Sequence, residues 1–395
     1  MRYDFDQRLD LRSSDCDRWR RYTEDVIPLW VADMDFISPQ PVIRALQERV
    51  AFGVFGYPEG AGFNEIGRME MRQIIVDRLW RLYRWQVEPD EIVFVPGVVP
   101  GLNLACHAVA EPGGAVLVQP PVYHPFLEAP QNAGMARQDA QLTRLADGSY
   151  QIDYDALSSP INDQTRMFIL CNPHNPVGRV FRRDELARLA EICLQRGVII
   201  CSDEIHCDLV YSGYQHIPIA CLDPEIARNT ITLMAPSKTF NIPGLQFSFA
   251  VIQNAGLREK YKKSGRGLAG WINTLGWVAA QAAYQDGQEW LEQVLAYLQA
   301  NRDFLFETAQ SELPGVSMAS PEATYLAWLD CRNSPAWDEV DGKRDAHQYF
   351  LEHARVALSE GAMFGAGGEG FVRLNFACPR SRLEEALQRM KHALK

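Results

Sequence analysis

The sequence predicts an α/β fold in which helices cover a mostly parallel sheet. Short runs of apolar, often β-branched residues alternate with amphipathic helical patterns through the middle of the 395-residue chain. Runs of this kind are typical of strands buried on both faces, as strands of parallel sheets are. Strands that alternate with helices build β-α-β units, and these units build parallel sheets.

The clearest unit spans residues 166–201. Residues 166–171 form an apolar run typical of a buried strand, and a second such run follows at 198–201. Between them we expect a helix that Asp184 caps and Gly197 ends. Its apolar positions recur at i, i+3, i+4 and i+7, namely Leu186, Leu189, Ala190 and Cys193. The segment therefore predicts strand, helix and parallel strand.

The same pattern extends to both sides and then stops. Further strands are expected at 92–95, 115–118, 230–234 and 247–252, the last of uncertain direction. A long helical pattern covers 289–313, after which strands and helices alternate less regularly. We therefore predict a large domain at 46–288, and a smaller α+β domain made of 1–45 and 289–395.

Composition narrows the class of protein. The net charge is −11 and the sequence pI is near 5.3, which argues against a nucleic-acid partner. No apolar run approaches the roughly 18 residues that a membrane span needs, and the charged N-terminus lacks a signal-peptide pattern. The nine cysteines form no C-x-x-C pair and look like reduced core residues. We expect a cytoplasmic protein without a membrane partner and without a metal site.

Candidate functional residues follow the predicted strands. In open parallel sheets, ligands bind beyond the carboxyl ends of the strands. The segments there include a Gly-Val-Val-Pro turn that opens a helix at 97–100, Tyr123, Asn175, Asp203 and Lys238. Each feature alone is more often structural: a turn, a packed ring, a loop former, a cap or a solvated charge. Their coincidence predicts a site for a phosphorylated aromatic aldehyde, whose anion suits a helix N-terminus.

Three motifs resemble a known family. They are Ser-Lys-Thr-Phe-Asn-Ile-Pro-Gly-Leu at 237–245, Asn-Pro-His-Asn-Pro at 172–176 and Asp-Glu-Ile-His at 203–206. Together they are similar to fold-type-I pyridoxal-phosphate enzymes of the aminotransferase class I/II superfamily. The segments Pro-Leu-Trp-Val-Ala-Asp-Met-Asp-Phe at 28–36 and Pro-Gly-Val-Val at 96–99 resemble its MalY/PatB-type cystathionine β-lyase, or carbon–sulfur lyase, branch. The resemblance spans nearly the whole chain.

The resemblance implies a role for each candidate around the cofactor ring. Lys238 would form the Schiff base with pyridoxal 5′-phosphate and later move protons. Asp203 would pair with the pyridinium nitrogen, which makes the ring an electron sink. Asn175 would hydrogen-bond the ring O3′, and Tyr123 would stack on the ring face. His206 would lie near O3′, where many relatives have a tyrosine; a structural histidine is the alternative.

It also implies how the phosphate is held. The groups that would bind it are the Ser237 side chain and the backbone of Gly97, Val98 and Val99. Many aminotransferases have a phosphate-binding arginine eight residues after the lysine, but this chain has Gln246 there. The lyase branch commonly lacks that arginine as well, so the departure favours that branch.

Two more residues complete the implied site. Tyr57 would reach the phosphate of a neighbouring subunit, which predicts a homodimer with a shared active site. Arg373, in an alternating pattern typical of a strand, would grip the α-carboxylate of an amino-acid substrate. A surface or interface ion pair is the alternative for this arginine.

The resemblance predicts β-elimination of L-cystathionine or a related cysteine S-conjugate, with pyruvate, ammonia and a thiol as products. An aminotransferase would use the same cofactor residues and is the nearest alternative. A regulatory protein that binds a transcription factor is an alternative of another class. The sequence does not separate cystathionine, cysteine, cystine and cysteine conjugates as substrates.

Overall fold

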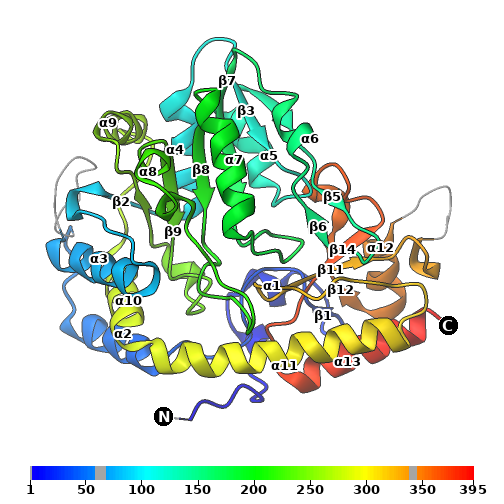
Figure 1. Ribbon diagram of the computed structural model, residues 1–395. Helices are drawn as coiled ribbons and strands as arrows, with labels where there is room; N and C mark the ends of the chain where they lie inside the picture. The colour runs from blue at the N-terminus through cyan, green and yellow to red at the C-terminus, as the bar shows by residue number, and fades with distance from the viewer. Residues whose placement is uncertain (1, 58–67, 338–344) are drawn as a thin grey trace.

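The computed structural model describes residues 2–57, 68–337 and 345–395. Its centre is a seven-stranded sheet with the strand order β2-β10-β9-β8-β7-β3-β4 (Figure 1). Every neighbouring pair from β9 to β4 is parallel, whereas β10 is antiparallel to both β9 and β2. The strands are β2 (Ile92–Val95), β10 (Ser248–Val251), β9 (Thr230–Met234), β8 (Ile199–Asp203), β7 (Thr165–Cys171), β3 (Ala115–Val118) and β4 (Ala136–Asp139). The predicted α/β class is confirmed.

Helices cover both faces of this sheet, as buried parallel strands require. Helices α4 (Val98–Val109), α5 (Pro125–Asn132) and α9 (Ala255–Ser264) contribute to one hydrophobic cluster with the sheet. Helix α7 (Arg183–Gln195) and the short α6 (Tyr154–Ser158) contribute to a second cluster on the other face. Because helices cover both faces of the sheet, a ligand is expected at the carboxyl ends of its strands.

The predicted strands lie where expected, with shifts at the ends. The strand predicted at 198–201 runs to Asp203, and the one of uncertain direction is β10, which is antiparallel. The predicted Asp184 cap is wrong, because α7 begins at Arg183 and Arg182 is its N-cap. The Asp184 carboxylate instead receives hydrogen bonds from the Arg182 guanidinium, and Glu185 accepts from the Arg182 backbone N–H.

The elements outside the central sheet are smaller sheets and further helices, of which α11 and α13 are long. Strand β1 (Ile27–Pro28) pairs in parallel with β12 (Val356–Ala357), and β14 (Phe371–Asn375) lies between β11 (Leu326–Asp330) and β13 (Ser359–Glu360). Helix α11 (Gln288–Glu312) runs alongside α13 (Arg380–Ala393) (Figure 1). The other elements are α1 (Asp17–Arg20), α2 (Gln40–Phe52), α3 (Met69–Tyr83), α8 (Pro224–Arg228), α10 (Thr274–Asp286), α12 (Ala346–Tyr349), β5 (Thr143–Arg144) and β6 (Tyr150–Gln151). The domain boundaries stay a prediction.

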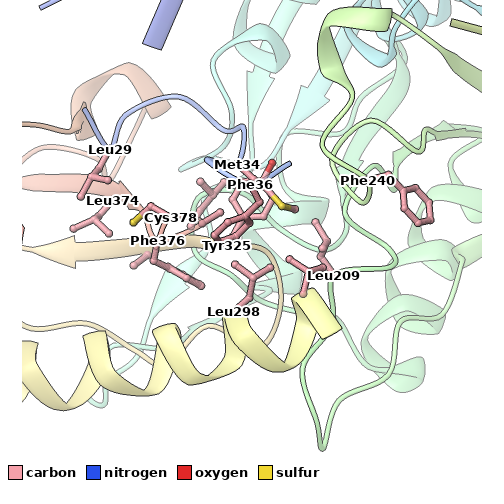
Figure 2. Close-up of a cluster of buried hydrophobic side chains, with 14 of the residues drawn as sticks. Leu29, Met34, Phe36, Leu209, Phe240, Leu298, Tyr325, Leu374, Phe376 and Cys378 are labelled. Atoms are coloured by element: carbon pink, nitrogen blue, oxygen red, sulfur yellow. The ribbon is translucent and has the colours of Figure 1, made fainter. Parts of the chain in front are cut away.

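A large hydrophobic cluster joins the N-terminal segment to the C-terminal elements. Figure 2 shows Leu29, Met34 and Phe36 from the N-terminal segment among side chains of α11, β14 and their neighbours. Tyr325 and Phe376 lie in the same cluster and are fully buried. Burial of such side chains stabilises the fold by about 1.5–3 kcal/mol each. The cluster fixes segment 29–36 in place. Within the described residues, no helix combines the length and apolar character that crossing a bilayer requires.

Candidate active site

A cavity of about 670 Å³ lies at the carboxyl ends of the parallel strands. Its volume falls in the range typical of small-molecule sites. The predicted site residues that line it are Gly97, Val98, Val99, Tyr123, Asn175, Asp203, His206, Ser237 and Lys238. They come from the ends of five different strands and the segments that follow, so the fold brings together residues that are far apart in the sequence.

Lys238 lies in the short segment that follows β9, and its half-buried side chain lines the cavity. The Nζ atom donates a hydrogen bond to the backbone oxygen of Ala32 at 2.7 Å. Burial lowers the pKa of Lys238 to about 8, and the positive charge of Arg373 acts in the same direction. The negative charges of Asp33 and Asp203 partly oppose this shift. A lysine in such surroundings is a better base and nucleophile at neutral pH than a solvated one.

Asp203 is the last residue of β8 and is 6% exposed. Its Oδ1 accepts a hydrogen bond from the backbone N–H of Ile205 at 3.0 Å. Burial raises the pKa of Asp203 to about 7, and the charge of Glu204 adds to this effect. The Ile205 hydrogen bond and the charge of Lys238 favour the ionised form. A cationic partner would therefore be needed to hold this carboxylate fully ionised at neutral pH.

Arg373 contacts the site through Asn175, which lines the cavity, whereas Arg373 itself is not among the lining residues. Arg373 lies in β14, as the predicted strand requires, and its Nη1 donates to the Oδ1 of Asn175 at 3.1 Å. Its Nη2 donates to the Trp30 backbone oxygen at 2.8 Å and to Ser359 Oγ at 3.2 Å. Burial lowers its pKa to about 10, which leaves the guanidinium charged at neutral pH. Arg373 is 5% exposed, which rules out an ion pair on the surface of the chain, whereas an interface ion pair and the predicted carboxylate contact stay predictions.

His206 is buried in the cavity wall with both ring nitrogens unused. Neither nitrogen has a hydrogen-bond partner among the described residues. Burial lowers the pKa of His206 to about 3, and the charges of Lys238 and Arg373 act in the same direction, so the ring is neutral. Buried polar atoms are rarely left without a partner. Such an imidazole is therefore suited to a polar group of a bound molecule.

The start of helix α4 supplies a second kind of binding group. Val98 and Val99 occupy its first turn, where backbone N–H groups have no acceptor within the helix. The N–H of Gly97 donates to Ser248 Oγ at 3.1 Å, and its predicted contact with a phosphate stays a prediction. Its φ of 125° is one that glycine adopts readily. Ser237 and Gln246 also line the cavity.

Tyr123 and Tyr57 were both predicted as site residues, but only Tyr123 lines the cavity. Tyr123 lines the cavity, and its backbone N–H donates to the backbone oxygen of Asn175 at 3.1 Å. Burial raises the pKa of the Tyr123 phenol, which keeps it neutral. Tyr57, in contrast, is not among the lining residues and is 82% exposed. Its ring meets the Trp271 ring edge-on, with the centroids 5.2 Å apart, and Trp271 does line the cavity.

Sequence reasoning missed the contribution of distant backbone and of Tyr325. The Ala32 oxygen accepts from Tyr325 Oη at 2.9 Å as well as from Lys238. Asn241 fixes the same N-terminal segment, because its side chain bonds the backbone of Met34 and Phe36. Asn241 belongs to the motif at 237–245. It contacts residues that lie 205 and 207 positions earlier in the chain, and no local pattern predicts such contacts.

Known proteins of similar sequence and structure match this chain over nearly its whole length. The chain is 38% identical to the cystathionine beta-lyase PatB of Bacillus subtilis, with 99% of each chain covered. Cystalysin of Treponema denticola, solved with pyridoxal 5′-phosphate, superposes with a TM-score of 0.92 at 32% identity, covering 100% of this chain and 99% of that one. The PLP-bound C-S lyase of Staphylococcus hominis gives 0.91 at 33% identity, covering 100% and 98%. The model of the aminotransferase class I and II family matches residues 24–390, and the chain therefore belongs to that family.

Proposed function

We propose that the chain binds pyridoxal 5′-phosphate in this cavity and catalyses β-elimination of L-cystathionine or a related cysteine S-conjugate. The products would be pyruvate, ammonia and a thiol. The observation that carries this proposal is the half-buried lysine Lys238, with a lowered pKa, in one cavity with the buried carboxylate of Asp203 and the start of helix α4. The relatives named above carry the cofactor or the name of this activity.

The cavity residues fit this cofactor. The first turn of α4 offers N–H donors and the positive end of its dipole to a phosphate, and Ser237 adds a hydroxyl. The unpaired ring nitrogens of His206 suit a polar substituent of the pyridine ring. The Asp203 carboxylate suits a protonated pyridine nitrogen, which would in turn keep it ionised. Tyr123 would stack on the ring, and the Asn175 amide would bond the ring hydroxyl.

The proposed reaction uses the remaining groups of the site. The Arg373 fork binds the α-carboxylate of the amino acid, since its charge survives burial. When bound, the cofactor supplies an electron sink for the negative charge that forms at Cα. Lys238 removes the Cα proton as general base, with a pKa near the ambient pH. The Cβ–S bond then breaks, the sulfur leaves with the electron pair as a thiolate and takes up a proton to give the thiol, and one water releases pyruvate and ammonia.

We infer that the active enzyme is a homodimer. Several large apolar side chains are exposed. Val50, Phe52, Val54 and Phe55 lie in α2 and the segment after it, and Leu268 and Trp271 line the cavity. Exposed apolar patches of this kind mark protein interaction sites. The exposed Tyr57 lies beside this surface and would contact the cofactor phosphate of a second copy.

A cytoplasmic location is part of the same proposal. All nine cysteines are free thiols, and most are buried, which is typical of a reducing compartment. A transcription-factor partner stays a prediction. A pull-down from lysate with the Lys238→Ala protein as bait would test it, and recovery of no stoichiometric partner would remove it.

The test of the proposed activity uses purified holoenzyme and L-cystathionine without any keto acid. Pyruvate, ammonia and free thiol are quantified over many turnovers. We expect equal amounts of all three, because elimination needs no second substrate. If products form only after a keto acid is added, and an amino acid accumulates, the enzyme is an aminotransferase.

A further inference from the structure

The residue directly after Lys238 is a buried threonine with a polar partner in another segment. Thr239 is 0% exposed and is not among the residues that line the cavity. Its Oγ donates a hydrogen bond to Asp208 Oδ2 at 2.9 Å. Asp208 ends the turn that follows β8, and the same turn carries His206. The hydroxyl of Thr239 therefore joins the turn of Lys238 to the turn of His206.

Asp208 is held in turn by a third segment. Its Oδ1 accepts a hydrogen bond from the Nη2 atom of Arg78, in helix α3, at 2.6 Å. The side chains of Arg78 and Asp208 are 8% and 6% exposed, so the ion pair is buried. One carboxylate thus connects α3, the turn after β8 and the turn after β9.

The surroundings of Arg78 keep this pair together. The guanidinium lies over the Tyr284 ring of α10, 4.7 Å from the ring centroid. Burial acts to lower the pKa of Arg78, the charge of Asp208 acts to raise it, and the net shift is upward, so the guanidinium is charged. A buried ion pair is costly unless further hydrogen bonds complete it. The hydroxyl of Thr239 supplies such a bond to the second oxygen of Asp208.

The bond from Thr239 restricts the backbone beside Lys238. Threonine is β-branched and stiff at χ1, so a fixed Oγ also fixes the direction of its Cα–Cβ bond. Asn241 anchors the same turn to the N-terminal segment. Within the turn, the Ile242 N–H donates to the Ser237 oxygen at 3.0 Å. The backbone that carries Lys238 is therefore held by side-chain bonds from both Thr239 and Asn241.

We propose that Asp208, held by Arg78, is a positioning residue that fixes Lys238 through the hydroxyl of Thr239. This inference rests on the proposed function, in which Lys238 attaches the cofactor and moves the Cα proton. The Ala32 oxygen orients the amine at the far end of the lysine side chain, and Thr239 fixes the backbone at the near end. Both ends matter, because a displacement of about 1 Å in a reacting group can slow a reaction about 100-fold.

The test separates the hydroxyl of Thr239 from its methyl group. Thr239→Val keeps the shape of the side chain and removes the hydroxyl, whereas Thr239→Ser keeps the hydroxyl and removes the methyl group. The first readout is the rate at which saturating pyridoxal 5′-phosphate attaches to the apoprotein at one fixed pH, followed by stopped-flow absorbance. The second is the dissociation constant of pyridoxine 5′-phosphate, which has no aldehyde and cannot attach to Lys238. Steady-state kinetics and thermal unfolding are measured in parallel.

Thr230→Val is the matched control. Thr230 begins β9, at the end of the strand opposite to the turn of Lys238. It is 1% exposed, and its Oγ donates to the Ile226 backbone oxygen at 2.7 Å. Valine at this position also removes a buried hydrogen bond, but it leaves the cavity untouched. The control should lower the unfolding temperature and leave the attachment rate at the wild-type value.

We expect Thr239→Val to slow the attachment about tenfold, the scale of one buried hydrogen bond to a charged group, and to lower kcat to a similar extent. The dissociation constant of pyridoxine 5′-phosphate and the KM for the amino acid should stay close to wild type, because their binding groups are unchanged. Thr239→Ser should restore most of the attachment rate. In an Asp208→Asn background, Thr239→Val should slow the attachment less, because the two substitutions disrupt the same bond.

An attachment rate in Thr239→Val that equals the wild-type rate would overturn the inference, as would a Thr239→Ser protein that is just as slow as Thr239→Val. An undiminished effect of Thr239→Val in the Asp208→Asn background would exclude Asp208 as the partner through which Thr239 acts. If Asp208→Asn does not fold, the comparison of valine with serine at Thr239 still decides. A wild-type apoprotein that binds neither pyridoxal 5′-phosphate nor pyridoxine 5′-phosphate would instead refute the proposed function.

Discussion

Lys238 and Tyr325 donate hydrogen bonds to the same acceptor, the backbone oxygen of Ala32, over 2.7 Å and 2.9 Å. Ala32 precedes Lys238 by 206 residues, so this contact joins the N-terminal segment to the segment that carries Lys238. Tyr325 is fully buried, and its ring meets the His206 ring edge-on. The phenol therefore holds the carbonyl that in turn orients the amine.

Replacing Tyr325 with phenylalanine removes this hydroxyl and keeps the ring. A buried hydrogen bond contributes about 0.5–1.5 kcal/mol net, so we expect kcat to fall about 2–10-fold. The KM for the amino acid should change less, because the proposed binding group for the substrate carboxylate is Arg373. Steady-state kinetics checks this, with the exposed Tyr214→Phe as the control. An unchanged kcat in Tyr325→Phe would show that Ala32 needs no second donor.

Replacing Asp203 with asparagine keeps the shape of the side chain and removes its charge. The pyridine nitrogen would then lose the partner that keeps it protonated, and the negative charge at Cα would be less stable. We expect kcat to fall by at least about 100-fold, a loss typical of removing a preorganised electrostatic partner. Surface Asp163→Asn should behave like the wild type. Near-normal turnover in Asp203→Asn would remove this residue from the mechanism.

The sequence predicted the parts of this site that local pattern determines. Buried strands followed by polar residues place Asp203 and Lys238 at the same edge of a parallel sheet, and there the structure has them. The direction of β10 and the shared acceptor at Ala32 depend on packing between distant segments, which leaves no local signal.

Covalent attachment of pyridoxal 5′-phosphate to the apoprotein should depend on pH through Lys238. Only the neutral amine attacks an aldehyde, and burial lowers the pKa of Lys238 to about 8. The rate should rise about tenfold per pH unit below this value and level off above it. Stopped-flow absorbance measures the rate, and Lys238→Ala should show no attachment. A rate that still rises tenfold per unit well above pH ~9 would mean an ordinary, solvated lysine.

Replacing Arg373 with lysine keeps the charge and removes the planar fork. A lysine cannot match the two oxygens of a carboxylate, nor can it keep the bonds to Asn175 and Ser359 together. We expect KM to rise about 10–100-fold, since hydrogen bonds to charged groups contribute about 1.5–3 kcal/mol. Thermal unfolding is followed in parallel, and the surface variant Arg137→Lys is the control. An unchanged KM in a folded protein would place the carboxylate elsewhere.

Mixing two inactive variants tests whether each site uses two subunits. Lys238→Ala removes the reactive amine, and Tyr57→Ala removes the side chain that would reach the phosphate of a second copy. In a hybrid dimer, one site combines the intact Lys238 of one subunit with the intact Tyr57 of its partner. After denaturation and random reassociation, activity should therefore recover to at most about a quarter of the wild-type value, because about half of the dimers are hybrids with one intact site each. Each variant refolded alone is the control. If hybrids separated by differential tags show no more activity than the controls, Tyr57 does not act across the interface, and its exposure has another cause.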